Sequence, residues 1–225
     1  MKRLFVLGLA MILILSCQKE EDDTSSPGIV TEFCTSKYMP LNVGNYWVYE
    51  HFLIDSLGNE TSMEKFDSMA ITRDSIIGDK KYFVLEGTNY PYKSSQEWGI
   101  IDILRDSIGY LVNQDGVIRF SRYNFTDTLA IKFGTSEDDT CYVIYCKMEK
   151  CDHPVTVPAG SFEVLNFRGE LYNHVLDTPK IDERYMNNYY AKDVGKIVQT
   201  WYLLSQTGFF SERRLIRYSI HEENI

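Results

Sequence analysis

From residue 44 onward the chain consists of short runs rich in aromatic and β-branched residues, each ended by turn-forming residues. The run 44–54, GNYWVYEHFLI, opens with a Gly-Asn turn signal and favours a pleated strand over a helix. Turn residues such as Gly78, Gly116 and Pro158 supply the positive or fixed φ that tight connections need. Thirteen strands are predicted in this way, over residues 44–54, 64–72, 80–87, 99–105, 109–113, 117–123, 129–133, 140–146, 152–157, 161–170, 184–191, 196–204 and 212–220.

Short strands at this close spacing predict an all-β fold, with one antiparallel β domain over residues 37–225. A curved sheet, an open barrel or a sandwich is expected, because a flat sheet of so many strands would leave long exposed edges. Segment 175–183 is the least strand-like, and its Asp-Thr-Pro sequence predicts a loop or a short turn of helix.

The first sixteen residues predict a signal peptide. Lys2 and Arg3 precede an apolar run at 4–15, which as a helix would reach about 18 Å, against about 30 Å for a bilayer core. The run is therefore too short for a permanent transmembrane helix and is typical of a secretory signal. With Ser16 and Cys17 it resembles a bacterial lipoprotein signal, which implies that Cys17 becomes the lipidated first residue and ties the protein to a membrane. An ordinary secretory peptide stays open, because Leu15 is bulky for that pattern.

Residues 17–36 predict a flexible tether, since they are polar and acidic and have no apolar period. The acidic run at 19–23 resembles the surface-export signal of Bacteroidota lipoproteins, which implies an outer-membrane lipoprotein exposed at the cell surface. An acidic spacer on a protein that faces the periplasm is the alternative.

The charge of the chain argues against nucleic-acid binding. The formal net charge is −9, and loss of the cations Lys2 and Arg3 with the signal peptide would make it −11. Nucleic-acid binding needs a basic face.

Four cysteines remain besides Cys17, and an exported protein favours two disulfides. Cys141 and Cys146 lie in one predicted strand, about 16 Å apart and on opposite faces, too far for a bridge. Residues 147–150 predict a hairpin loop that brings Cys146 to Cys151, which leaves Cys34 for Cys141. Although His153 follows Cys151 closely, the spacing matches no common zinc pattern, so neither a metal nor a cofactor is expected.

No catalytic motif is found, and we expect a protein that is not an enzyme. Ser161 lacks the second glycine of a nucleophile elbow, and the four histidines form no metal-binding pair. A hydrolase with two scattered carboxylates stays open.

An Asp-Ser or Asp-Thr pair followed by an apolar residue recurs five times. It resembles the O-glycosylation acceptor motif of exported Bacteroidota proteins, whereas the plain alternative is a turn that enters a strand. The acceptor candidates are Ser56, Ser68, Ser75, Ser107 and Thr128.

The chain is rich in aromatic residues, with 16 Tyr, 12 Phe and 3 Trp. Exposed aromatic rings can stack on sugars, so this composition is consistent with glycan binding. Tyr90, Tyr92 and Trp98 are the best candidates because they lie outside a clean strand. The alternative is that aromatic rings fill the core of a sheet.

Three segments carry a family resemblance: 38–50, YMPLNVGNYWVYE; 155–162, VTVPAGSF; and 190–201, YAKDVGKIVQTW. They look like recurring elements of uncharacterised Bacteroidota lipoproteins. Physically they indicate turns and strands, with Trp47 and Trp201 as core candidates. By analogy of fold alone, the pattern is similar to half-open barrels that carry lipids or lipoproteins.

The function expected from the sequence is a binding or structural module of the envelope, with a glycan, a lipid or a protein as partner. A carrier of an apolar ligand predicts a deep apolar cavity. A surface glycan-binding protein predicts a shallow row of exposed rings instead.

Overall fold

The computed structural model describes residues 37–88, 97–136, 139–173, 180–202 and 210–221. The described residues contain no α-helix, and hence none with the length and hydropathy to cross a membrane. They form antiparallel strands, which confirms the all-β prediction. The strands are β1 (Tyr46–Ile54), β2 (Glu60–Ile77), β3 (Lys80–Gly87), β4 (Gly99–Ser107), β5 (Tyr110–Asn113), β6 (Ile118–Ser121), β7 (Ala130–Ser136), β8 (Asp139–Lys150), β9 (Val155–Val157), β10 (Gly160–Phe162), β11 (Val164–Asn173), β12 (Lys180–Met186), β13 (Asn188–Ala191), β14 (Gly195–Tyr202) and β15 (Phe210–Ser219).

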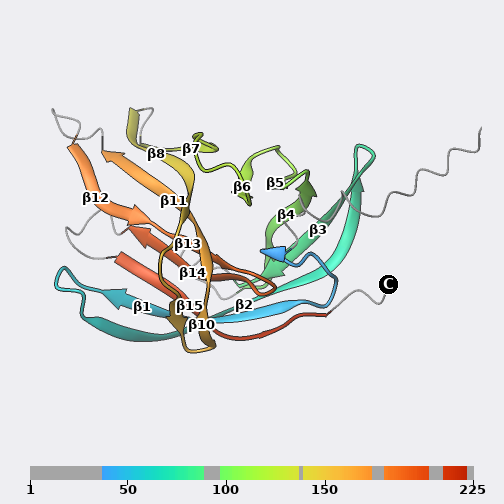
Figure 1. Ribbon diagram of the computed structural model, residues 1–225, viewed down its shortest axis with the longest axis horizontal. Helices are drawn as coiled ribbons and strands as arrows, with labels where there is room; N and C mark the ends of the chain where they lie inside the picture. The colour runs from blue at the N-terminus through green and yellow to red at the C-terminus, as the bar shows by residue number, and fades with distance from the viewer. Residues whose placement is uncertain (1–36, 89–96, 137–138, 174–179, 203–209, 222–225) are drawn as a thin grey trace, which may run out of the picture.

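One sheet contains all of these strands except the small hairpin β9–β10. Its order is β6-β5-β4-β3-β2-β1-β15-β14-β13-β11-β8-β7, with β12 paired to β11. In Figure 1 the sheet curves so that β6 and β7, the two ends of this order, both lie at the top of the view. The sheet is thus nearly closed into a barrel, as expected for so many strands.

Contacts across the inside hold the first end of the sheet in place. The ring of Phe120 in β6 lies 4.7 Å, between centroids, from the ring of Tyr190 in β13, and Phe120 is fully buried. The Tyr190 hydroxyl also donates a hydrogen bond of 3.4 Å to the Arg119 carbonyl. The edge strand β6 therefore packs against the inner face of the far wall.

Strand β2 is longer than the predicted 64–72 because it pairs with a different neighbour at each end. Its first part pairs with β1 from Glu60 to Ala70, and its second part pairs with β3 from Met69 to Ile77. Only its middle is buried, so its ends lack the alternation that marks a strand in a sequence.

The core contains both tryptophans that the sequence indicated. Trp47 is fully buried and donates a hydrogen bond of 2.6 Å to the Val194 carbonyl, and Trp201 is 4% exposed. Gly195 lies beside Trp47 with a φ of +111°, and an added Cβ would be 3.0 Å from the Trp47 Nε1.

The predicted hairpin at 147–150 is wrong. Strand β8 continues to Lys150 and pairs with β11 throughout, from Tyr142 opposite Asn173 to Lys150 opposite Leu165. Cys146 and Cys151 are therefore separated by about 16 Å of extended chain, and both are free thiols. The Cys146–Cys151 disulfide is thus also wrong.

The other predicted disulfide joins Cys34 to Cys141. Cys34 and the side chain of Cys141 lie outside the described part of the structure. Several segment boundaries also differ from the prediction, two of them in kind. Residues 180–183, predicted as part of a loop, belong to β12, and the predicted strand 161–170 is divided at Glu163 into β10 and β11.

Gly195→Ala is expected to lower the free energy of unfolding by about 3 kcal/mol, from backbone strain and from the clash with Trp47. Gly116→Ala is the control, since Gly116 has a φ of +79° with nothing within 4 Å, and about 1 kcal/mol is expected. Urea denaturation measures both. Equal losses would show that Trp47 shifts at little cost.

Candidate ligand-binding cavity

A cavity of about 370 Å³ lies inside the curved sheet. One part of its wall is apolar, and these side chains are Met39, Met69, Leu85, Ile101, Leu104, Leu111 and Phe167. The other lining side chains are polar or charged, and four of the eight are cationic: Asp102, Arg119, Lys132, Asn188, Tyr190, Lys196, Gln199 and Arg213. The cavity therefore offers an apolar surface and a charged surface to one occupant.

Two lining residues, the apolar Ile101 and the charged Arg119, reach the cavity through irregular strand pairing. The register between β3 and β4 shifts between Leu85 and Glu86, so that Ile101 and Asp102, although adjacent in sequence, both line the cavity. A second shift between β5 and β6 leaves Arg119 between the paired residues Ile118 and Phe120. Such bulges redirect a side chain that strict alternation would place on the other face.

The charged side chains differ in how they are paired. Arg119 donates a hydrogen bond of 2.9 Å from its Nε to the Asp102 carboxylate. Arg213 donates one of 2.9 Å to the Gln199 side chain and lies 3.8 Å from the Asp67 carboxylate. The Lys196 ammonium donates a hydrogen bond of 3.4 Å to the Gln199 oxygen and lies over the Tyr190 ring, 5.3 Å from its centroid. Lys132 has no ion pair or hydrogen bond with the described part of the chain.

The pKa of the Lys196 ammonium lies well below its usual value. Burial is the first cause, because it disfavours the charged form, and repulsion by Arg213, Lys132 and Arg119 adds to it. The Asp102 carboxylate acts in the opposite direction. The four cations line one cavity.

A buried polar network fixes Arg213 in the cavity wall. His51 and Asp67 have no exposed side-chain surface, and the His51 Nε2 lies 2.5 Å from the Asp67 Oδ2. The same carboxylate faces the Arg213 guanidinium, which also lies over the Tyr49 ring at 4.5 Å. Arg213 is therefore held by charge and by aromatic packing.

Most residues singled out in the sequence lie away from this cavity. Trp98 is 53% exposed and precedes β4, whereas Tyr90, Tyr92 and Cys17 lie outside the described residues. Of the five glycosylation candidates, Ser56 and Thr128 are exposed in connections, and Ser68, Ser75 and Ser107 are partly buried in β2 and β4. The glycosylation of these residues stays a prediction.

The sequence carried no signal for the cavity cations. Lys132 lies between Ile131 and Phe133, an alternation that ordinarily places the apolar side chains inside, yet these two are 49% and 66% exposed and Lys132 lines the cavity. Arg119 is placed by a bulge, which no local sequence pattern indicated.

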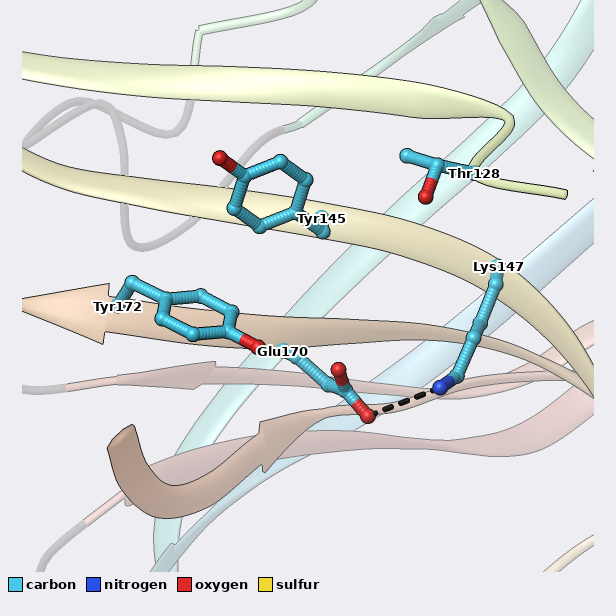
Figure 2. A pocket seen from close by; sticks show the side chains of 5 residues that line it. All are labelled: Thr128, Tyr145, Lys147, Glu170 and Tyr172. Atoms are coloured by element: carbon cyan, nitrogen blue, oxygen red, sulfur yellow. Dashed lines mark ion pairs between the residues drawn. The ribbon is translucent and has the colours of Figure 1, made fainter. Parts of the chain in front are cut away.

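A second hollow, of about 410 Å³, lies on the outer face of the sheet (Figure 2). Tyr145 and Lys147 of β8 alternate with the buried Ile144, Cys146 and Met148, which places them on the outside. The rings of Tyr145 and Tyr172 meet at 89° with centroids 5.2 Å apart. The hollow is completed by an ion pair of 3.0 Å between Lys147 and Glu170, and by Thr128.

No protein-family profile matches the chain, and no curated protein matches it. Two solved structures align with it. A "putative exported protein with YMCC-like fold" from Bacteroides fragilis is 12% identical, with a TM-score of 0.42 over 79% of this chain and 96% of that chain. A "putative lipoprotein" from Parabacteroides distasonis is 14% identical, with a TM-score of 0.41 over 80% and 96%.

Asp67→Ala is expected to destabilise the fold by about 3–5 kcal/mol, because it leaves the buried Arg213 guanidinium without its carboxylate. Asp74→Ala is the matched control on the same strand. Asp74 pairs with Lys81 at the surface, where such a pair contributes about 1 kcal/mol or less. Thermal and urea unfolding measure both variants, and similar losses would refute a structural role for Asp67.

Proposed function

We propose that this chain is a lipid-anchored protein of the bacterial envelope that holds the apolar part of a small amphiphile inside its half-open barrel. The observation that carries the proposal is the cavity of about 370 Å³, with seven apolar side chains on its wall. Its size lies within the range of small-molecule sites, about 300–1,000 Å³. A sheet that stops short of full closure gives such a ligand a way in and out.

The N-terminal sequence supports the envelope location. Cys17 after a short apolar segment fits a lipid anchor, and the acidic tether over 17–36 would hold the barrel clear of the head groups. We further propose that the anchor lies in the outer membrane and that the domain faces the cell surface. The role is binding without catalysis, as the absence of a catalytic motif in the sequence suggests.

Ile101→Trp is expected to block the cavity, because Ile101 lines it and the larger ring would fill it. Ile100→Trp is the matched control. Ile100 is the preceding residue, and its side chain lies on the other face of the sheet and is 55% exposed. The probe is N-phenyl-1-naphthylamine, an uncharged dye that fluoresces in apolar surroundings. The protein is the mature chain from residue 17 with Cys17→Ser, which carries no lipid.

One dye per chain is expected to bind, with at least tenfold weaker binding to Ile101→Trp and unchanged binding to Ile100→Trp. A tenfold loss corresponds to about 1.4 kcal/mol. No saturable binding to the parent chain, or equal binding to both variants, would contradict the proposal.

Glycan binding is a second candidate function, which the outer hollow favours. The two tyrosine rings meet at a corner, and Thr128, Lys147 and Glu170 place polar groups around it (Figure 2). Aromatic rings offer an apolar face to a sugar, while hydroxyl, ammonium and carboxylate groups can bind its hydroxyls. This hollow is more open to solvent than the inner cavity. Its Lys147 and Glu170 already form an ion pair with each other.

Tyr145→Ala is expected to abolish any retardation of the protein in native gels that contain dextran, mannan or pectin. Tyr218→Ala is the control, because Tyr218 is 36% exposed, close to the 39% of Tyr145, but lies on β15. A parent chain that none of these polysaccharides retards would rule this candidate out.

A further inference from the structure

The cationic part of the cavity wall is assembled from four separate strands. Arg119 comes from β6, Lys132 from β7, Lys196 from β14 and Arg213 from β15. No local sequence run accounts for this gathering. The fold itself brings the four cations to one cavity, which seven apolar side chains also line.

Carboxylates neutralise only part of this charge. Asp102 pairs with Arg119, and Asp67, which is buried and does not line the cavity, pairs with Arg213. Lys132 and Lys196 form no ion pair with a carboxylate within the described residues, although the charge of Asp102 acts on Lys196. Two basic side chains of the cavity are thus left without an ion-pair partner in the described part of the chain.

An unmatched charge in a partly buried wall lowers stability, and here the cations also repel one another. At Lys196, burial first and the three neighbouring cations second hold the pKa well below its usual value. Acidic residues are not scarce in the chain, which has 32 Asp and Glu against 23 Lys and Arg. The positive excess is therefore a local property of the cavity and opposes the charge of the whole protein.

Strand β7 also lowers stability, because it exposes apolar side chains while its lysine lines the cavity. It exposes Phe133 by 66% and Ile131 by 49% while Lys132 lines the inside. A one-residue shift in register would bury both apolar side chains and expose the lysine. In the observed register the two apolar side chains are not buried, and a cation lies in the cavity instead.

We propose that the amphiphile carries a dianionic head group of the phosphate-monoester kind, bound between Lys132 and Lys196, with its apolar chain against the apolar side chains that also line the cavity. A bound dianion favours the charged form of Lys196, so that the two ammonium groups balance its two negative charges, and each has rotatable N–H donors that suit phosphate oxygens. Arg119 and Arg213, already paired, would line the head group from either side. This inference rests on the proposed function, since it names the ligand class of the same cavity.

Displacement of N-phenyl-1-naphthylamine from the mature Cys17→Ser chain tests the head group. Dodecyl phosphate is expected to displace the dye at concentrations at least tenfold lower than dodecyl maltoside, which has the same chain and a neutral head. Raising the salt concentration should narrow this difference, because salt screens charge. Inorganic phosphate alone should not displace the dye.

Lys132→Met and Lys196→Met are each expected to weaken dodecyl phosphate binding about tenfold and to leave dodecyl maltoside binding unchanged. Lys192→Met is the matched control, because Lys192 is on the surface beside β13, with a side chain 59% exposed. Circular dichroism confirms that each variant is folded. A variant that fails to fold is replaced by Lys→Gln at the same position, which keeps most of the side-chain volume.

Equal displacement by the phosphate and the maltoside, or lysine variants that weaken neither, would overturn the head-group inference and leave the proposed function standing. Displacement by inorganic phosphate as strong as by dodecyl phosphate would identify a free anion as the ligand and overturn the amphiphile. Failure of both amphiphiles to displace a bound dye would overturn the inference together with the proposed function.

Discussion

The inner face of the long antiparallel sheet is covered by the sheet itself, and the cavity follows from this constraint. The described residues contain no helix that could pack on that face. An exposed apolar face of this size would be unstable in water, so the sheet curves until β6 packs on β13 through Phe120 and Tyr190. Because closure depends on a few large side chains at one end, the space between the walls is only partly filled.

The charged residues inside the barrel fall into two groups that serve different purposes. Arg213 is enclosed by Asp67, Gln199 and the Tyr49 ring, so its charge is compensated and its position is fixed. Lys132 and Lys196 have long flexible stems and form no ion pair among the described residues. Compensated charges hold a structure in one arrangement, whereas uncompensated ones remain available to a ligand. This contrast separates the fixed Arg213 from the two lysines that we propose to bind the head group.

The sequence was sufficient to predict strands whose alternation is complete. Strand β3 has the predicted bounds, and Trp47 and Trp201 were recognised as core residues. It was insufficient where pairing is decided by distant strands. The tetrapeptide 147–150 is polar and was taken for a loop, yet it pairs with β11, and this error produced the incorrect disulfide.

The same limit explains why the cavity was only partly foreseeable. A lipid carrier with an apolar cavity was among the expectations, but not a cationic wall. Arg119 is placed by a shift in register, which depends on how β5 meets β6. The alternation of β7 would ordinarily put Lys132 outside. Lys196 lies next to Gly195 in a segment that the sequence indicated only as the start of a strand.

The opposite charges of the exterior and the cavity suit a protein that binds an acidic amphiphile beside a membrane. With a net charge of −9, or −11 once Lys2 and Arg3 are removed, the protein surface does not attract anionic head groups in general. Beyond about 8 Å in physiological salt, however, exposed charges are screened, so the acidic exterior has little effect on an anion already inside the barrel. Inside, burial of the apolar chain would supply most of the binding free energy, while the two lysines would select the head group. Anchor, tether and cavity charge would together restrict binding to molecules that have left the bilayer surface and entered the barrel.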